Sequence, residues 1–214
     1  MQGPVILQIL FVFENCLVII CIPANLVTIV ILSCGKCDLS KGISLYLVSM
    51  AAADLLVVIF GIILTSLYYS YFPFSFLSYT AVCSVNGTLG YAAIDCSVWL
   101  TIAFTFDRFV AICYYNLKAR YCTEKTAAMV ITTVCVVSVL RNVPFYFKYQ
   151  PYGTMDGIPW GCATKPDFFT LPGWVAFFWV HHLLNPLTPY ILILLFNALT
   201  VRHIMLANRA RRGL

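Results

Sequence analysis

The chain has 214 residues, of which 62% are apolar or aromatic and 10% are charged, and its mean hydropathy is +0.91. A typical soluble domain carries about 25% charged residues, so this chain has too much apolar surface and too few charges to fold in water. The composition therefore excludes a soluble domain, a disordered chain, a coiled coil and collagen. It predicts that the chain lies in a lipid bilayer.

Five apolar stretches have the length of a membrane-spanning helix, which needs about 20 apolar residues. They cover residues 8–33, 43–69, 80–114, 126–147 and 174–204. None alternates with the period of two that marks a barrel strand, and the first is too long for the apolar core of a signal peptide. We therefore predict an all-α membrane helix bundle, with residues 1–214 forming a single, incomplete transmembrane domain.

The basic residues between these stretches predict the orientation of the bundle. One side carries only Lys148 and Lys165, which Asp156 and Asp167 offset. The other side carries Lys36, Lys41, Lys118, Arg120, Lys125, Arg209, Arg211 and Arg212. The second side is therefore predicted to be cytosolic, with the N-terminus outside and the C-terminus inside. This topology accounts for the net charge of +5 and gives no reason to expect a nucleic-acid partner.

The ten cysteines separate by compartment. Those within the spans behave as small apolar residues, and those in the cytosolic loops lie in a reducing environment. Only Cys83 and Cys162 face the oxidising side, so elimination predicts a disulfide between them. The spacing Cys34-Gly-Lys-Cys37 resembles a metal or redox pair, but no second pair of ligands accompanies it. We interpret these two as inert or lipidated loop cysteines, and no metal site is predicted with certainty.

Ionisable residues within the apolar stretches are functional hypotheses, because each costs about 2.5–3.5 kcal/mol to insert into lipid. They are Glu14, Asp54, Asp95, Asp107, Arg108 and Arg141.

The third stretch ends in Phe106-Asp107-Arg108-Phe109-Val110-Ala111-Ile112-Cys113 and begins near Cys83. This pattern resembles the third helix of a rhodopsin-like (class A) G-protein-coupled receptor. Further marks of that family occur in the correct order, namely Asn25, Asp54, Ser97, Pro189 and Asn197. The resemblance implies a seven-helix receptor fold, of which this chain contains five helices.

The chain also departs from the family pattern. Phe109 replaces the usual tyrosine, residues 126–139 lack the usual tryptophan, and Tyr115 replaces a loop proline. The sequence stops at Leu214, although seven spans with loops need roughly 280 residues. We therefore expect a fragment or truncated product that does not signal unaided.

The resemblance implies two sites along the bundle. Asp107, Arg108 and Phe109 would form the switch that couples to a G protein; the alternative is an ion pair that merely anchors the helix end. Asn25, Asp54 and Ser97 would form a polar core that suits a sodium ion or a shared proton; the alternative is a purely structural network with a protonated aspartate. No other cofactor is expected.

Residues on the third and fifth stretches form the predicted ligand pocket. They are Gly90, Tyr91, Ile94, Asp95, His181 and Asn185. Gly90 replaces the aspartate with which amine receptors of the family bind an ammonium, and it is expected, with Gly87, to widen the pocket mouth. Asp95 could be a structural acid and His181 a solvated interfacial residue. Arg141 is expected to reach the outer surface or a ligand carboxylate.

These features predict a multi-pass plasma-membrane receptor that binds an extracellular peptide or aromatic small molecule and acts on a heterotrimeric G protein. Residues 111–126 are similar to a small orphan-receptor subgroup proposed to sense tryptophan and phenylalanine. The alternatives are a transporter or channel subunit and a truncated receptor that does not signal. A membrane enzyme is not expected, because no nucleophile with a base and no metal cluster is evident.

Overall fold

The structure, a computed structural model, describes residues 5–34, 39–67, 71–72 and 74–212. Within these residues, five helical segments are long and apolar enough to cross a membrane, which confirms the predicted helix bundle. They run over Gln8–Ser33, Lys41–Thr65, Thr80–Cys113, Glu124–Lys148 and Pro172–Arg211. Residues 68 and 69, at the end of the predicted second span, lie outside the described residues.

Three of the five spans change their helical geometry along their length. The first and third are single α-helices, α1 (Val5–Ser33) and α4 (Thr80–Cys113). The second span is α2 (Lys41–Leu56), continued by the π-helix η1 (Val57–Leu67). The fourth is α6 (Glu124–Asn142), continued by the 3-10 helix η3 (Val143–Lys148). The fifth consists of α8 (Pro172–His182), the π-helix η4 (Leu183–Leu187) and α9 (Thr188–Arg212) in succession. Such π segments are rare and often occur at functional sites.

Local sequence explains where some of these changes occur. The hydroxyl of Thr123 accepts a hydrogen bond from the backbone N–H of Thr126 and caps the start of α6, as threonine commonly does. Pro186 lies inside η4 and cannot donate a backbone hydrogen bond. A wider turn at this position lets the last span continue past the proline.

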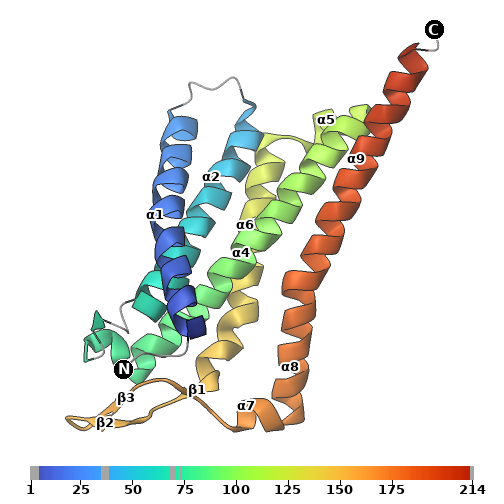
Figure 1. The fold of residues 1–214 in the computed structure, drawn as a ribbon. Helices are drawn as coiled ribbons and strands as arrows, with labels where there is room; N and C mark the ends of the chain where they lie inside the picture. The colour runs from blue at the N-terminus through green and yellow to red at the C-terminus, as the bar shows by residue number, and fades with distance from the viewer. Residues whose placement is uncertain (1–4, 35–38, 68–70, 73, 213–214) are drawn as a thin grey trace.

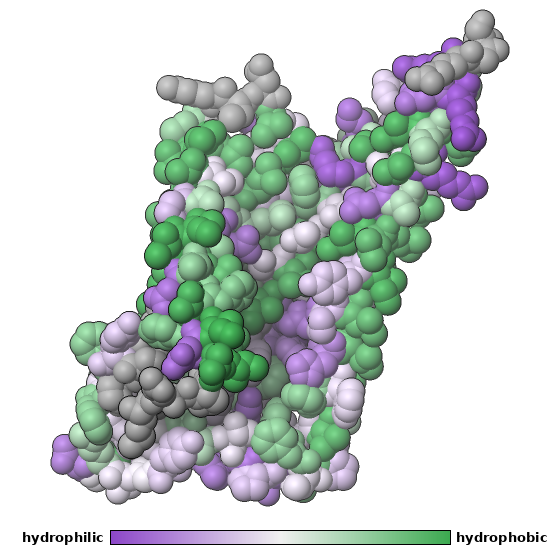
Figure 2. Space-filling model, viewed as in Figure 1, coloured by the Kyte–Doolittle hydropathy of each residue, from purple (hydrophilic) through white to green (hydrophobic). Residues whose placement is uncertain are grey.

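The helix α4 lies at the centre of the bundle and packs against α2, η1, α6 and α9, whereas α1 packs against α2 and η1 (Figure 1). The core of the bundle is built around Ala53, Cys96 and Leu100, and small side chains at such contacts let membrane helices approach closely. On the face shown in Figure 2, hydrophobic residues cover the sides of the long helices. This is the surface expected of a protein whose solvent is lipid.

The two ends of the bundle carry different short elements. One end holds the start of α1, the 3-10 turn η2 (Phe76–Ser78), the four short strands and α7 (Asp167–Thr170), and the other holds α5 (Tyr115–Tyr121) and the end of α9 (Figure 1). Hydrophilic residues gather at the end of α9 (Figure 2). The basic residues at 118, 120, 209 and 211 lie in this second end, so we call it the inner end and the strand-bearing end the outer end.

The outer loop between the fourth and fifth spans folds into two antiparallel pairs of strands. They are β1 (Tyr149–Gln150) with β4 (Ala163–Thr164), and β2 (Gly153–Met155) with β3 (Ile158–Trp160). Asp156 and Gly157 form the turn between β2 and β3 with φ of 52° and 78°. Two positive φ values and an Asp-Gly pair are typical of a type I′ hairpin turn.

The outer loop is attached to the start of α4 by the disulfide between Cys83 and Cys162, whose Cα atoms are 6.3 Å apart. This confirms the pairing predicted from the sequence. Next to it, the hydroxyl of Thr80 donates to the carbonyl of Gly161 at 2.8 Å, and the Gly161 N–H donates to the carbonyl of Ser78 at 2.8 Å. The loop is therefore held over the outer end of the bundle by covalent and hydrogen bonds together.

Candidate ligand cavity and switch

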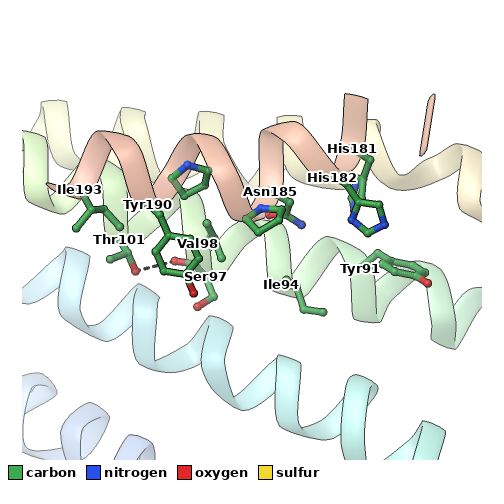
Figure 3. Close-up of a pocket in the computed structure, with 12 residues that line it drawn as sticks. Tyr91, Ile94, Ser97, Val98, Thr101, His181, His182, Asn185, Tyr190 and Ile193 are labelled. Carbon is green, nitrogen blue, oxygen red and sulfur yellow. Dashed lines mark hydrogen bonds between the residues drawn. The ribbon is translucent and has the colours of Figure 1, made fainter. Parts of the chain in front are cut away.

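A cavity of about 400 Å³ lies between α4 and the last span, within the size range of small-molecule sites. Its walls are mostly apolar and its lining includes Tyr91 and Ile94 from α4 and His181, Asn185 and Tyr190 from the last span. Figure 3 shows these residues along the two helices, with Tyr91 and His181 at one end of the row and Thr101 and Ile193 at the other. Four of the six residues predicted for the pocket thus line one cavity.

Gly90 and Asp95 do not line this cavity, and the expected widening of its mouth is wrong. A Cβ at Gly90 would lie 3.8 Å from the backbone of Phe60 and Gly61, an ordinary van der Waals distance, so Gly90 faces η1 and not the cavity. A Cβ at Gly87 would meet the hydroxyl of Tyr149 at 2.8 Å. Gly87 therefore serves the close packing of Tyr149 against α4, and neither glycine leaves additional room for a ligand.

Asp95 is fully buried and accepts hydrogen bonds from three side chains. Arg141 contacts Oδ2 through both Nε, at 2.9 Å, and Nη2. Asn142 Nδ2 also donates to Oδ2, and Asn185 Nδ2 donates to Oδ1, each at 2.5 Å. The expectation that Arg141 reaches the outer surface or a ligand is therefore wrong, because its guanidinium neutralises a buried carboxylate of the neighbouring helix. Asp95 is the structural acid that the sequence analysis considered.

This Asp95–Arg141 pair could have been anticipated from the sequence. Two opposite charges in adjacent membrane helices have a strong reason to meet, since each alone is costly in lipid. Asn185 was expected to face a ligand, but its amide also joins the pair to the last span. It does so from within η4, so the π-helix carries a residue that both lines the cavity and binds the buried ion pair.

His181 is 5% exposed, so the alternative that it is a solvated interfacial histidine is wrong. Its ring contacts the rings of Phe145 at 4.9 Å and Tyr91 at 5.9 Å, measured between centroids. Tyr91 and Phe145 stack on each other at 4.3 Å. His181 Nδ1 is buried without a hydrogen-bond partner among the described residues. The outer end of the cavity is therefore an aromatic cluster that includes a histidine.

Lys148 lies within this aromatic cluster, although from the sequence it was expected only as a basic residue of the outer side. Its Nζ donates to the hydroxyl of Tyr91 at 3.2 Å. It also lies 4.9 Å, 5.2 Å, 5.3 Å and 5.9 Å from the ring centroids of Phe168, Tyr149, Tyr91 and Phe145, respectively, within cation–π range. Burial and the neighbouring Tyr91 raise the pKa of Tyr149 to about 12, so Tyr149 is an uncharged phenol at neutral pH. The only sequence signal was a lysine directly after the run of aromatic residues 145–147.

The predicted polar core is partly assembled. The hydroxyl of Ser97 donates to Asp54 Oδ1, whereas Asn25 Nδ2 donates to the carbonyl of Cys21 in its own helix at 2.9 Å. Asn25, Asp54 and Ser97 nevertheless line one second cavity of about 320 Å³. The structure thus brings three oxygen-bearing side chains from three helices to one space, with a direct bond between two of them.

At the inner end of α4, the guanidinium of Arg108 folds back onto Asp107, with Nε donating to Oδ2 at 3.1 Å and Nη2 contacting the same oxygen. The Arg108 guanidinium carbon also lies 5.6 Å from the centre of the Phe104 ring. Phe109 stacks on Phe196 of α9 at 5.6 Å. The three residues predicted for the switch therefore lie together, beside the helix that ends the described chain.

The cysteine spacing at 34–37 can be followed only in part, because Lys36 and Cys37 lie outside the described residues. Cys34 is a free, exposed cysteine. Across the part of the chain that the structure describes, no group of three or more His, Cys, Asp or Glu side chains could hold a metal ion.

These features define a membrane receptor built on a helix bundle: a disulfide at the outer end of α4, a ligand-sized cavity beside the middle of α4, and an Asp-Arg pair at its inner end. The family model described as "7 transmembrane receptor (rhodopsin family)" matches residues 24–213. The chain therefore belongs to the rhodopsin family of seven-transmembrane receptors, and the transporter and channel alternatives are set aside.

Individual relatives are distant but cover most of the chain. Neuropeptide receptor 22 of Caenorhabditis elegans is 23% identical over 78% of this chain and 38% of its own length. The FMRFamide receptor of Drosophila melanogaster is 25% identical over 95% of this chain and 39% of its own length. A rhodopsin of Orconectes australis is 23% identical over 99% of this chain and 70% of its own length. The chain thus spans about two-fifths of the length of the two peptide receptors. The resemblance of residues 111–126 to receptors for aromatic amino acids stays a prediction.

Proposed function

We propose that this chain forms the ligand-receiving and signal-transmitting core of a plasma-membrane receptor that acts on a heterotrimeric G protein. One observation carries the proposal: the single helix α4 bears the disulfide at its outer end, one wall of the cavity along its middle and the Asp107–Arg108 pair at its inner end. A ligand in the cavity contacts the same helix whose other end would face the G protein.

The ligand class that the cavity favours is a peptide end or an aromatic small molecule. Its lining is mostly apolar, and aromatic rings form its outer end, which suits an aromatic group more than a nucleotide. Two of the relatives are named as a neuropeptide receptor and an FMRFamide receptor, which supports a peptide as one form of that ligand.

The inner end supplies the means of switching. Asp107 and Arg108 are neighbours in sequence, so their side chains do not face each other along the helix as residues three or four apart do. Arg108 has to bend back to reach Asp107, and a bound ligand would bias the equilibrium between this closed arrangement and a released one. Released, the guanidinium would be free to bind a partner protein.

We also propose that Asp54, Ser97 and Asn25 bind a sodium ion. The side chains present fit such an ion, because a carboxylate, a hydroxyl and an amide oxygen are hard donors of the kind that alkali and alkaline-earth cations prefer. The ion would neutralise Asp54 and draw the first three spans together at this depth.

The decisive experiment is ligand-stimulated guanine-nucleotide exchange on purified heterotrimeric G proteins, using the complete gene product in lipid nanodiscs. A library of short peptides and aromatic amino-acid derivatives supplies candidate ligands. Exchange that rises with one of them, and that Arg108→Ala abolishes while ligand binding persists, supports the proposal. Exchange that is unaffected by Arg108→Ala contradicts the assigned switch.

A further inference from the structure

Beside the outer end of the cavity lies Lys148, whose positive charge no carboxylate of the described residues neutralises. The ion pairs among the described residues join Lys41 to Glu124, Arg108 to Asp107 and Arg141 to Asp95, and Lys148 belongs to none of them. Its Nζ instead bonds the hydroxyl of Tyr91, which lines the cavity. A ligand that fills the cavity and extends past Tyr91 therefore meets this ammonium.

The carboxylates close to the cavity are already engaged. Asp95 receives the guanidinium of Arg141, so this pair is neutral as a unit. Asp54 accepts from Ser97 and lines the neighbouring cavity rather than this one. At the outer end of this cavity, Lys148 is therefore the charged side chain among the described residues that no ion pair neutralises, and it repels a cationic ligand there.

The surroundings of Lys148 keep its ammonium charged and oriented but do not provide hydrogen-bond acceptors for all of its N–H donors. Four ring faces attract the ammonium, which is a favourable but undirected interaction. An ammonium has three N–H donors, and the hydroxyl of Tyr91 accepts one of them. The neutral phenol of Tyr149 provides a ring face and no counter-charge. As far as the described residues go, two donors thus remain for an acceptor that arrives from the cavity.

We infer that Lys148 is a specificity-determining residue, and that the natural ligand is an aromatic or apolar molecule bearing a carboxylate, which pairs with the Lys148 ammonium while its apolar body fills the space between α4 and the last span. The inference rests on the proposed role of this cavity as the ligand pocket. The mostly apolar walls suit a carboxylate, whose single charge one ammonium neutralises, better than a phosphate, whose second charge would stay unpaired.

The test uses three probes that share a ring and a chain and differ in charge: phenylpropanoate, phenylpropanamide and phenylpropylamine. Their binding to the 214-residue chain is measured by ligand-observed NMR in nanodiscs of zwitterionic lipid, so that the lipid favours neither charge. We expect the carboxylate to bind about 10- to 100-fold more tightly than the amine, which is the ratio that a hydrogen bond to a charged group provides. Tighter binding of the amine, equal binding of the two, or no binding of the carboxylate overturns the inference.

Variants locate the effect at one side chain. Lys148→Met should remove the preference for the carboxylate, and Lys148→Arg should retain most of it. Lys165→Met is the matched control, because it removes the other lysine of the same loop while its backbone N–H keeps its bond to the carbonyl of Lys148. A preference that survives in Lys148→Met, or that disappears equally in Lys165→Met, contradicts the inference.

These measurements need no G protein and therefore stand apart from the exchange assay. Charge-selective binding without nucleotide exchange would contradict the proposed signalling and leave the role of Lys148 intact. Nucleotide exchange driven by a cationic ligand would support the proposed signalling and contradict the role of Lys148.

Discussion

At the outer end of the bundle the strong links join segments far apart in the chain, whereas at the inner end the central ion pair joins two consecutive residues of one helix. The Cys83–Cys162 disulfide and the contacts of Asp95 tie α4 to the outer loop, α6 and η4. The Asp107–Arg108 pair ties α4 only to itself, and its neighbours across the bundle are aromatic contacts such as Phe109 with Phe196. Under the proposed function, a ligand would bind where these links hold the helices in place, and the change of shape would occur at the opposite end.

The largest expected effect comes from removing the disulfide. The double variant Cys83→Ser, Cys162→Ser opens a loop with a sequence separation of 79 residues, and the chain-entropy model assigns such a loop about 4–5 kcal/mol of stability. We expect a marked fall in Tm, measured by thermal unfolding in nanodiscs. Replacing the buried free cysteine Cys96 by alanine controls for the loss of a cysteine as such, and a Tm drop no larger than that of the control would argue against a rigid outer frame.

The second-largest loss of stability is expected from breaking the buried ion pair between Asp95 and Arg141. Asp95→Asn leaves the Arg141 guanidinium without its counter-charge inside the bundle, which costs about 3–5 kcal/mol when one partner of a buried pair is removed. The double variant Asp95→Asn, Arg141→Met should recover most of that loss, because no isolated charge remains. Chemical unfolding of the single and double variants measures the coupling. If the losses simply add, the two residues are not paired in the membrane.

A smaller effect is expected at Gly161, next to the disulfide. Its φ is 78°, and a Cβ there would meet Tyr152 Cδ2 at 2.8 Å. Gly161→Ala should therefore cost roughly 1–2 kcal/mol from the left-handed backbone alone. Gly157 has the same φ, but a Cβ there would lie in open space. At Gly153 a Cβ would meet no atom and φ is not in the left-handed region, so Gly157→Ala and Gly153→Ala are the matched controls. The unfolding midpoint should be highest for Gly153→Ala, lower for Gly157→Ala and lowest for Gly161→Ala. Any other order would show that the loop is not held as described.

The smallest change in stability is expected at the inner end. Asp107→Asn removes an ion pair that is partly exposed on the arginine side, and pairs of this kind are worth about 0–1 kcal/mol. The variant should nevertheless raise ligand-independent nucleotide exchange in the complete receptor, since it releases Arg108. Lys41→Met, which breaks the exposed pair with Glu124, should change neither quantity. A large loss of stability in Asp107→Asn would remove the contrast between the two ends.

The architecture could be predicted well from the sequence because a bilayer requires apolar spans of a fixed length and basic residues mainly on the cytosolic side. Apolar length and the distribution of basic residues were enough for the five spans, and the compartments of the cysteines were enough for the disulfide. The polar pairs inside the bundle were harder. Asp95 and Arg141 were both noticed, but each was considered alone, although opposite charges on adjacent membrane helices have a physical reason to pair.

Packing detail could not be predicted from the sequence. Gly87 and Gly90 indicated space, and only the three-dimensional arrangement shows that Tyr149 and the backbone of η1 fill it. Lys148 looked like an ordinary loop residue, because its four aromatic neighbours come from three separate parts of the chain. The π-helices were also missed, since a wide turn differs from an ordinary one by a single residue and leaves the hydropathy unchanged.

The π-helix η4 has a mechanical consequence for the last span. A wide turn accommodates extra backbone, and returning it to α geometry would carry one residue past the turn. The whole of α9 would then rotate by about 100° and advance by about 1.5 Å, the increments of one helical residue. That motion would take Phe196 away from Phe109. A displacement of Asn185 in η4 would in this way be converted into a rotation at the inner end of α9.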